Sequence, residues 1–345
     1  MRGPGIFLAQ FADDVWPFNA IEPFAQWAAD LGYKGVQIPT WDTRLFDLEK
    51  AASSKTYCED YLSILDKNGL ELCELASYLQ GQVLAMHPAY QKLFQAFYPK
   101  GLNARQSMVW ATEQLEKTIQ ASIHFGTTNI SVMSGGLAWP YIYPWPQRSA
   151  GLVDDAFSEL VKRWMPILDK AKNQGVTFGY ELHPGSDLYD GATFQRFLEM
   201  TNGHAAVGLT YDASHFLLQQ LDYIHFIQLF GNRIKAFHVK DAEFLPNGLT
   251  GVYGGYLDWK QRAGRFRSLG DGQVDFSRIF TELSLKGFSG WAIMEWECCI
   301  KSSEQGAREG APFIQNHMIQ ASERSFDDFA KSETDKGLNK DILGI

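Results

Sequence analysis

Cysteine is scarce in this sequence. The four cysteines, Cys58, Cys73, Cys298 and Cys299, form no CxxC pair and are too few for a disulfide framework in a chain of 345 residues. The adjacent Cys298 and Cys299 leave two interpretations: a redox switch, or two buried thiols at the end of a strand. Free cysteines are usually buried, which favours the second interpretation.

Long apolar runs are also missing. No stretch approaches the about 20 residues that a membrane-spanning helix needs. The first residues, MRGPGIFLAQFADD, lack the long apolar core and the small-residue cleavage site of a signal peptide. We therefore expect a soluble, cytoplasmic protein with no membrane partner.

Positive charge is in deficit. The chain has 31 Lys and Arg residues against 40 Asp and Glu residues, which gives a net charge of −9 with neutral histidines. A surface of this sign repels a phosphate backbone, so we expect no nucleic-acid partner. A local basic patch for a single phosphate stays open.

The pattern that is present is a short apolar run followed by a longer amphipathic segment, repeated along the chain. It predicts strands at residues 5–11, 36–39, 70–75, 129–133, 176–181, 206–212, 234–239 and 291–295. It predicts helices at residues 20–31, 55–67, 104–125, 154–173, 192–201, 222–230 and 275–286, and a helical tail through about residue 329. Glycines suited to left-handed helix ends follow six of these helices: Gly32, Gly69, Gly126, Gly175, Gly231 and Gly287.

This alternation predicts an α/β fold. Strands that are almost continuously apolar are typical of a parallel sheet buried on both faces. With no linker between the units, we expect residues 1–345 to form one domain, a single (β/α)8 TIM barrel with a helical C-terminal tail. A doubly wound open sheet is the alternative, and the lack of GxGxxG after the first strand disfavours its dinucleotide-binding form.

Three connections after strands are unusually long: residues 76–103, 134–153 and 242–269. In a barrel they lie at the C-terminal face, where active sites occur. They hold many aromatic residues, among them Trp139, Tyr141, Tyr143, Trp145, Tyr253, Tyr256 and Trp259. Aromatic rings stack on the C–H faces of sugars, so we expect Trp139, Trp145 and residues 253–259 to line or cover the mouth. A homo-oligomer contact there stays open.

Four successive strands end in, or near, a residue that can ligate a metal: Glu181, Asp212, His238 and Glu295. In a closed barrel all four side chains reach the same mouth. Two Glu, one Asp and one His make a hard, oxygen-rich set that suits one Mn²⁺ or Mg²⁺, with Co²⁺ or Zn²⁺ as alternatives. The competing interpretation is that each acid pairs with a nearby Lys or Arg.

Each of these four residues has a polar companion. By the period of two along a strand, His183 shares a face with Glu181, Lys240 with His238, and Glu297 with Glu295. His215 follows Asp212 within reach of it. We expect His183, His215, Lys240, Asp241 and Glu297, with Trp139, to bind substrate. Alternatively, Lys240 and Asp241 pair with each other, the histidines are structural, and Glu297 replaces Glu295 as ligand.

The ordered set of Glu181, Asp212 with His215, His238 and Glu295, with GDGQVDF at residues 270–276, resembles the xylose-isomerase-like barrel superfamily. More narrowly it resembles the sugar (phosphate) isomerase/epimerase branch. The resemblance implies that the four strand-end residues bind one Mn²⁺ or Mg²⁺ and that Glu181 and Glu295 are the acid/base pair. It also implies that an arginine, Arg265 or Arg267, contacts substrate hydroxyls beside His183 and His215.

The implied activity is metal-dependent isomerisation or epimerisation of a keto sugar or related polyol through a metal-stabilised enediolate. If a leaving group lies β to the carbonyl, the same site acts as a 3-keto-glycoside lyase or hydrolase. The aromatic loops and the segment at residues 295–314 resemble longer relatives that act on oxidised sugars and glycosides. An endonuclease IV-type nuclease is disfavoured by the acidic charge and by only 8 histidines. A sugar-binding barrel without catalysis is the non-enzyme alternative.

Overall fold

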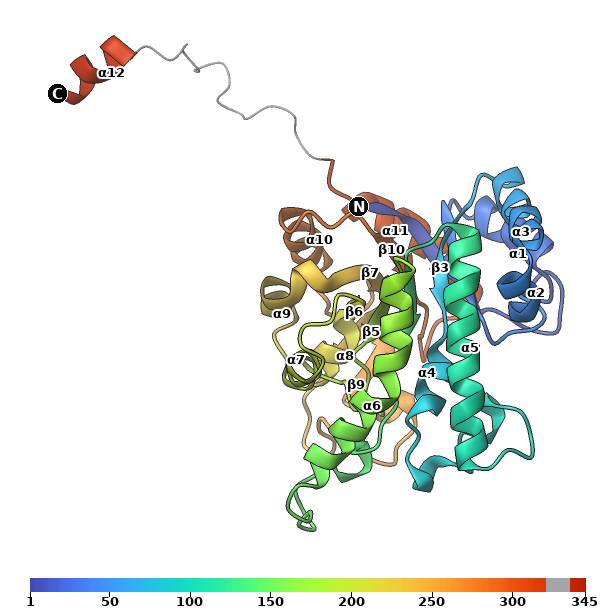
Figure 1. Cartoon of the computed structure of the whole chain (residues 1–345). Coiled ribbons are helices and arrows are strands. Elements are labelled where there is room, and N and C mark those ends of the chain that lie inside the picture. Colours follow the sequence, from blue (N-terminus) through green and yellow to red (C-terminus); the bar gives the residue numbers. More distant parts are fainter. Residues whose placement is uncertain (321–335) are drawn as a thin grey trace.

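The computed structural model describes residues 1–320 and 336–345 (Figure 1). Its main sheet is a closed parallel barrel with the strand order β1-β10-β7-β6-β5-β4-β3-β2. These strands are β1 (Arg2–Phe7), β2 (Gly35–Pro39), β3 (Glu71–Ala76), β4 (Asn129–Val132), β5 (Thr177–Glu181), β6 (Val207–Asp212), β7 (Ile234–Val239) and β10 (Trp291–Met294). The predicted (β/α)8 barrel is confirmed.

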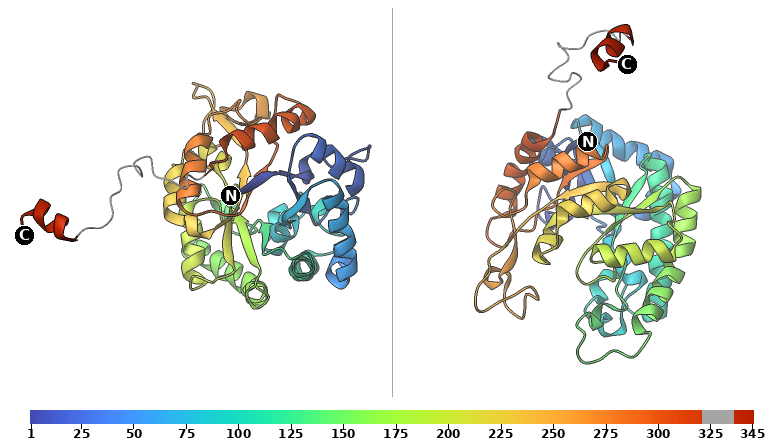
Figure 2. Two further views of the ribbon diagram at one scale, coloured as in Figure 1. Left: turned by 90° about the horizontal axis from the view of Figure 1, so that it is seen from above. Right: turned by 90° about the vertical axis from the view of Figure 1, so that its left-hand side faces the viewer.

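Helices surround the strands, as the view from above shows (Figure 2, left). They are α1 (Ile21–Asp30), α2 (Leu48–Ser53), α3 (Lys55–Lys67), α4 (Tyr78–Leu84), α5 (Ala104–Phe125), α6 (Leu152–Asn173), α7 (Gly191–Met200), α8 (Ala213–Leu218), α9 (Tyr223–Phe230), α10 (Phe276–Leu285) and α11 (Ser303–His317). A further helix, α12 (Lys336–Leu343), follows the residues that the structure does not describe. The expected tail corresponds to α11, and its part beyond residue 320 lies outside the described residues. Within the described part of the chain, no helix is both long and apolar enough to cross a membrane.

Helix boundaries mostly follow the expected end signals. Helix α5 begins with a capping box in which Asn103 and Gln106 exchange side-chain and backbone hydrogen bonds, and it ends at Gly126 with a φ of 74°. Gly231 is the exception. Its φ is −52°, because the chain continues from α9 directly into the 3-10 turn Gly231–Arg233, so the left-handed end expected there is wrong.

The alternation along β5 separates two environments. Phe178 and Tyr180 point outward and pack on the fully buried Trp164 of α6, with ring centroids 5.4 and 4.9 Å apart. Glu181, next in the strand, therefore points into the barrel. At Gly179 a Cβ would lie 2.6 Å from Oγ1 of Thr210, so the interior leaves no room for a side chain there.

The long connections project from the end of the barrel opposite the N-terminus (Figure 2, right). One of them contains an antiparallel hairpin, β8 (Asp241–Phe244) and β9 (Gly264–Arg267), which the sequence pattern did not predict. The loop after β4 reaches the loop between β8 and β9 through Tyr143 and Tyr253, whose ring centroids are 5.6 Å apart.

Asp241, expected to bind substrate, holds the GDGQVDF segment instead. Its buried carboxylate accepts backbone N–H bonds from Ala242, Gly270, Gly272 and Val274 at 2.8, 3.0, 2.9 and 3.2 Å. A Cβ on Gly272 would lie 2.2 Å from Asp241 Oδ1, which explains the glycine. Among the described residues Asp241 and Lys240 form no ion pair or hydrogen bond with each other, so the structure does not support that alternative pairing.

We predict that Asp241→Asn lowers the free energy of unfolding by about 2 kcal/mol or more, because an amide cannot replace a carboxylate toward several buried N–H donors. Asp271→Asn is the control. Asp271 is partly exposed and pairs with Lys301 at 2.7 Å, so its loss should cost less than about 1 kcal/mol. Urea unfolding of both variants tests this, and equal losses would contradict the assigned role of Asp241.

Candidate metal centre

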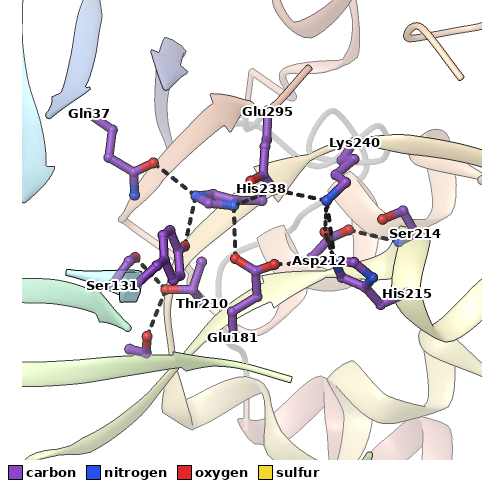
Figure 3. A network of polar contacts seen from close by, with 12 residues as sticks. Gln37, Ser131, Glu181, Thr210, Asp212, Ser214, His215, His238, Lys240 and Glu295 are labelled. Carbon is purple, nitrogen blue, oxygen red and sulfur yellow. Dashed lines mark hydrogen bonds and ion pairs between the residues drawn. The ribbon is translucent and has the colours of Figure 1, made fainter. Parts of the chain in front are cut away.

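Three of the four expected ligands meet at the C-terminal mouth of the barrel (Figure 3). Nδ1 of His238 lies 2.9 Å from Oε2 of Glu295 and 3.2 Å from Oε2 of Glu181. One oxygen or nitrogen of each of the three lies within 4.8 Å of the others. All three are buried, and they come from β5, β7 and the end of β10.

Asp212, the fourth expected ligand, joins this group from β6, where it pairs in register with His238. Its Oδ1 accepts the N–H of Ser214 at 2.8 Å and caps α8, which starts at the next residue. Its Oδ2 lies 3.3 Å from Nε2 of His215 and 3.5 Å from Nζ of Lys240. The first turn of α8 thus brings His215 back over the strand ends.

Lys240 is, with His238, one of two positively charged groups in the site. Its buried Nζ lies 3.4 Å from Oε2 of Glu295 and 3.2 Å from Oε2 of Glu297. It also lies 4.5 Å from the ring centroid of Phe266 on β9. Burial lowers the pKa of Lys240, but the surrounding carboxylates outweigh burial and hold its pKa well above the ordinary value.

The same balance sets the charges of the other groups. Burial alone would raise the pKa of Glu181, but its contacts with His215 and His238 hold that pKa well below the usual range. Burial raises the pKa of Asp212 to about 7, while Lys240 opposes the shift. Burial and the nearby Lys240 lower the pKa of His215 to about 3, so His215 is neutral at physiological pH.

These residues fit a divalent cation. Oε2 of Glu181 and Oδ2 of Asp212 are buried, and although nitrogens of His238, His215 and Lys240 lie 3.2–3.5 Å from them, none of the described residues donates a well-aligned hydrogen bond to either oxygen. A buried carboxylate oxygen that accepts no hydrogen bond can be satisfied by binding a cation. A second triad, Glu181, His183 and His215, also lies within 4.8 Å, because the rings of His183 and His215 are 4.2 Å apart.

The structure does not bring the expected arginines to this cluster. Arg267 and Arg265 both pair with Glu243, at 2.7 and 2.6 Å. They share one face of β9, whereas Phe266 between them faces Lys240. Both arginines thus pair with Glu243 and not with the carboxylate cluster, and the substrate contacts expected of Arg267, Arg265 and Asp241 stay predictions.

The contacts of Trp139 are with the segment that follows β5. Its backbone N–H bonds to the buried Asp187 at 2.8 Å, and its ring packs on Tyr189 with centroids 5.3 Å apart. Trp145 is 71% exposed on the same loop. Trp259, from the other long connection, lines a cavity, as expected for a residue of the mouth.

That cavity has a volume of about 340 Å³ and adjoins the carboxylates through Glu297. Its walls are Gln10, Trp259, Phe266, Trp296, Glu297, Cys298 and Cys299. Cys298 and Cys299 are free and partly exposed, so the interpretation of two buried thiols at the end of a strand is wrong, and no disulfide joins them. The cavity offers aromatic walls next to the charged cluster.

Sequence reasoning missed Gln10, Gln37 and Phe266. Nε2 of Gln10 donates to Oε1 of Glu295 at 3.0 Å, and Oε1 of Gln37 lies 3.0 Å from Nε2 of His238. A polar residue inside the apolar run 36–39 was the available signal for Gln37. Nothing in the sequence marked Gln10, because residues 5–11 were predicted as one strand, whereas β1 ends at Phe7 and a 3-10 turn follows.

Comparison with curated proteins finds inosose dehydratases. The one from Geobacillus thermodenitrificans (strain NG80-2) is 30% identical over 130 residues, or 37% of this chain and 43% of that protein. The one from Lacticaseibacillus casei is 27% identical over 146 residues, or 42% of this chain and 48% of that protein. The matches thus span less than half the length of these relatives.

Solved structures share the fold. An L-ribulose 3-epimerase superposes with a TM-score of 0.60 and 17% identity, covering 92% of this chain and 95% of its own. A 3-keto-D-glucoside 4-epimerase from E. coli superposes with a TM-score of 0.61 and 14% identity, covering 90% and 98%. The family model described as xylose isomerase-like TIM barrel matches residues 25–317. With this match and its closed barrel, the protein belongs to the xylose isomerase-like TIM barrel family.

Proposed function

We propose that this protein is a divalent-metal-dependent enzyme that isomerises or epimerises a keto sugar or related polyol. The observation that carries the proposal is the meeting of Glu181, His238 and Glu295, together with buried carboxylate oxygens that accept no well-aligned hydrogen bond from the described residues. The names of the relatives, which include sugar epimerases and inosose dehydratases, support a sugar-like substrate. Glu181, Asp212, His238 and Glu295 are the proposed ligands of Mn²⁺ or Mg²⁺.

The chemistry divides between the ion and the side chains. A bound divalent ion would supply Lewis acidity toward the carbonyl and the neighbouring hydroxyl of the substrate. Glu181 is ionised near neutral pH because its pKa is lowered, so it can accept the proton on the carbon next to the carbonyl. Glu295, which also contacts His238, is the second member of the proposed acid/base pair.

Proton return requires a donor beside Glu295. The protonated Lys240 lies 3.4 Å from that carboxylate and 3.2 Å from Glu297, so it can pass a proton to either. Return to the opposite face of the same carbon gives an epimer. Return to the neighbouring carbon gives an isomer.

Elimination is the second candidate. If a hydroxyl or glycosidic oxygen lies β to the carbonyl, proton removal by the same glutamate expels it, as a lyase or dehydratase does. Two observations favour this outcome: the curated relatives are named inosose dehydratases, and the aromatic cavity beside Glu297 has room for a substituent. A sugar-binding barrel without catalysis would show no proton exchange at all.

We predict that Glu181→Gln and Glu295→Gln each slow solvent deuterium incorporation into a keto-sugar substrate by about 10²–10⁴-fold, the usual contribution of a general acid or base. An amide keeps the shape of each side chain but cannot accept the proton. Glu243→Gln is the matched control, since Glu243 is also buried but its ion pairs among the described residues are with Arg265 and Arg267, outside the cluster. Mass spectrometry of the recovered sugar measures the exchange. Wild-type exchange in both site variants would place the base elsewhere.

We also predict that Mn²⁺ stabilises the metal-stripped protein, because it relieves repulsion among buried carboxylates. At a concentration 100 times the dissociation constant, the gain is about 2.7 kcal/mol, seen as a higher melting temperature. His238→Gln should remove most of this shift. Thermal unfolding with and without a chelator is the measurement, and an unchanged wild-type melting temperature speaks against a metal site.

A further inference from the structure

A polar layer fills the barrel just beneath the candidate metal centre. It contains Gln37 of β2, Glu74 of β3, Asn129 and Ser131 of β4, and Thr210 of β6, all buried. Barrel interiors are usually filled with branched apolar side chains. Burying a carboxylate and an amide there is costly unless every polar atom has a partner. The donor or acceptor role of each atom therefore fixes how the neighbouring side chain is oriented.

Glu74 fixes the orientation of Gln37. Oε1 of Glu74 accepts from Nε2 of Gln37 at 2.7 Å, and also from the hydroxyl of Ser131. Oε2 of Glu74 accepts from Nδ2 of Asn129 at 2.6 Å. An ionised carboxylate only accepts hydrogen bonds, so the amide nitrogen of Gln37, and not its oxygen, must face Glu74.

Gln37 in turn determines which ring nitrogen of His238 keeps its hydrogen. Because its amide nitrogen faces Glu74, its Oε1 faces Nε2 of His238 at 3.0 Å (Figure 3). An amide oxygen only accepts, so Nε2 must carry hydrogen. Without a metal ion Nδ1 also carries hydrogen and faces Glu295 at 2.9 Å and Glu181 at 3.2 Å, so the ring is positively charged. A ring that binds a metal ion is neutral and keeps one N–H, and Gln37 keeps that hydrogen on Nε2, which frees the lone pair of Nδ1.

We infer that Gln37 and Glu74 are positioning residues that hold His238 in the tautomer whose Nδ1 lone pair faces Glu181 and Glu295. The chain of contacts runs from Glu74 through Gln37 to His238 and ends where the cation would bind. Partners behind a ligating histidine commonly orient the ring and raise its basicity. This inference rests on the proposed function, because the tautomer matters only to a ligand of a metal.

The test separates hydrogen bonding from packing. Gln37→Leu keeps a side chain of similar size without an acceptor. Mn²⁺ dissociation constants of the metal-stripped full-length proteins are measured by the electron paramagnetic resonance of free Mn²⁺. We expect binding about 10–100-fold weaker in Gln37→Leu than in wild type.

Gln80→Leu is the matched control. Gln80 is as buried as Gln37 but lies on α4, and its Oε1 has no hydrogen-bond partner among the described residues. The same chemical change there should leave the Mn²⁺ dissociation constant unchanged. Weakened binding in both leucine variants would indicate a general packing effect and overturn the inference.

A spectroscopic measurement needs no variant of Gln37. In ¹⁵N-histidine-labelled protein loaded with diamagnetic Mg²⁺, the ring of His238 should carry its proton on Nε2, and His238→Gln identifies its signals. A proton on Nδ1 overturns the inference even if Gln37→Leu does not fold. Wild-type Mn²⁺ binding with equal affinity in Gln37→Leu overturns the inference alone, whereas no binding by wild type overturns the proposed function with it.

Discussion

Repulsion among buried carboxylates at the barrel mouth is the constraint around which the rest of the site is arranged. Glu181, Asp212 and Glu295 lie where water cannot screen them, and Lys240 and His238 lie between them. The attraction of the carboxylates for Lys240 and His238 outweighs the cost of burying these two cations, so the pKa of each is raised. The carboxylates are stable together only when positive charge lies between them. The same carboxylates are therefore well suited to bind a metal cation in place of a protonated side chain.

The sequence predicted the strand-end residues well because their positions follow from simple periodicity. In a parallel barrel every strand ends at the same mouth, and alternation places His183 on the face of Glu181 and Lys240 on the face of His238 without further information. The metal-ligand roles of these residues stay predictions until the binding and exchange measurements are made. The closed barrel itself is confirmed, since eight apolar runs and their helices leave few other arrangements.

The predictions that failed concern irregular segments, because such segments have no repeating pattern from which the direction of a side chain can be predicted. The hairpin β8–β9 lies within a stretch interpreted as a loop, so nothing indicated that Phe266 faces inward and Arg267 outward. Asp241 was placed by its neighbour Lys240, yet its partners are backbone N–H groups about 30 residues further along the chain. Long-range contacts of this kind are set by tertiary structure and leave no local pattern.

Asp212 carries a last consequence. One of its oxygens caps the start of α8 and the other faces Lys240 and His215. A single side chain is thus shared between a helix terminus and the charged cluster, and neither can be altered without the other. Rotating the carboxylate toward a different ligand would uncap α8, and fraying of α8 would swing His215 out of place. Local secondary structure and the geometry of the centre are therefore formed, and lost, together.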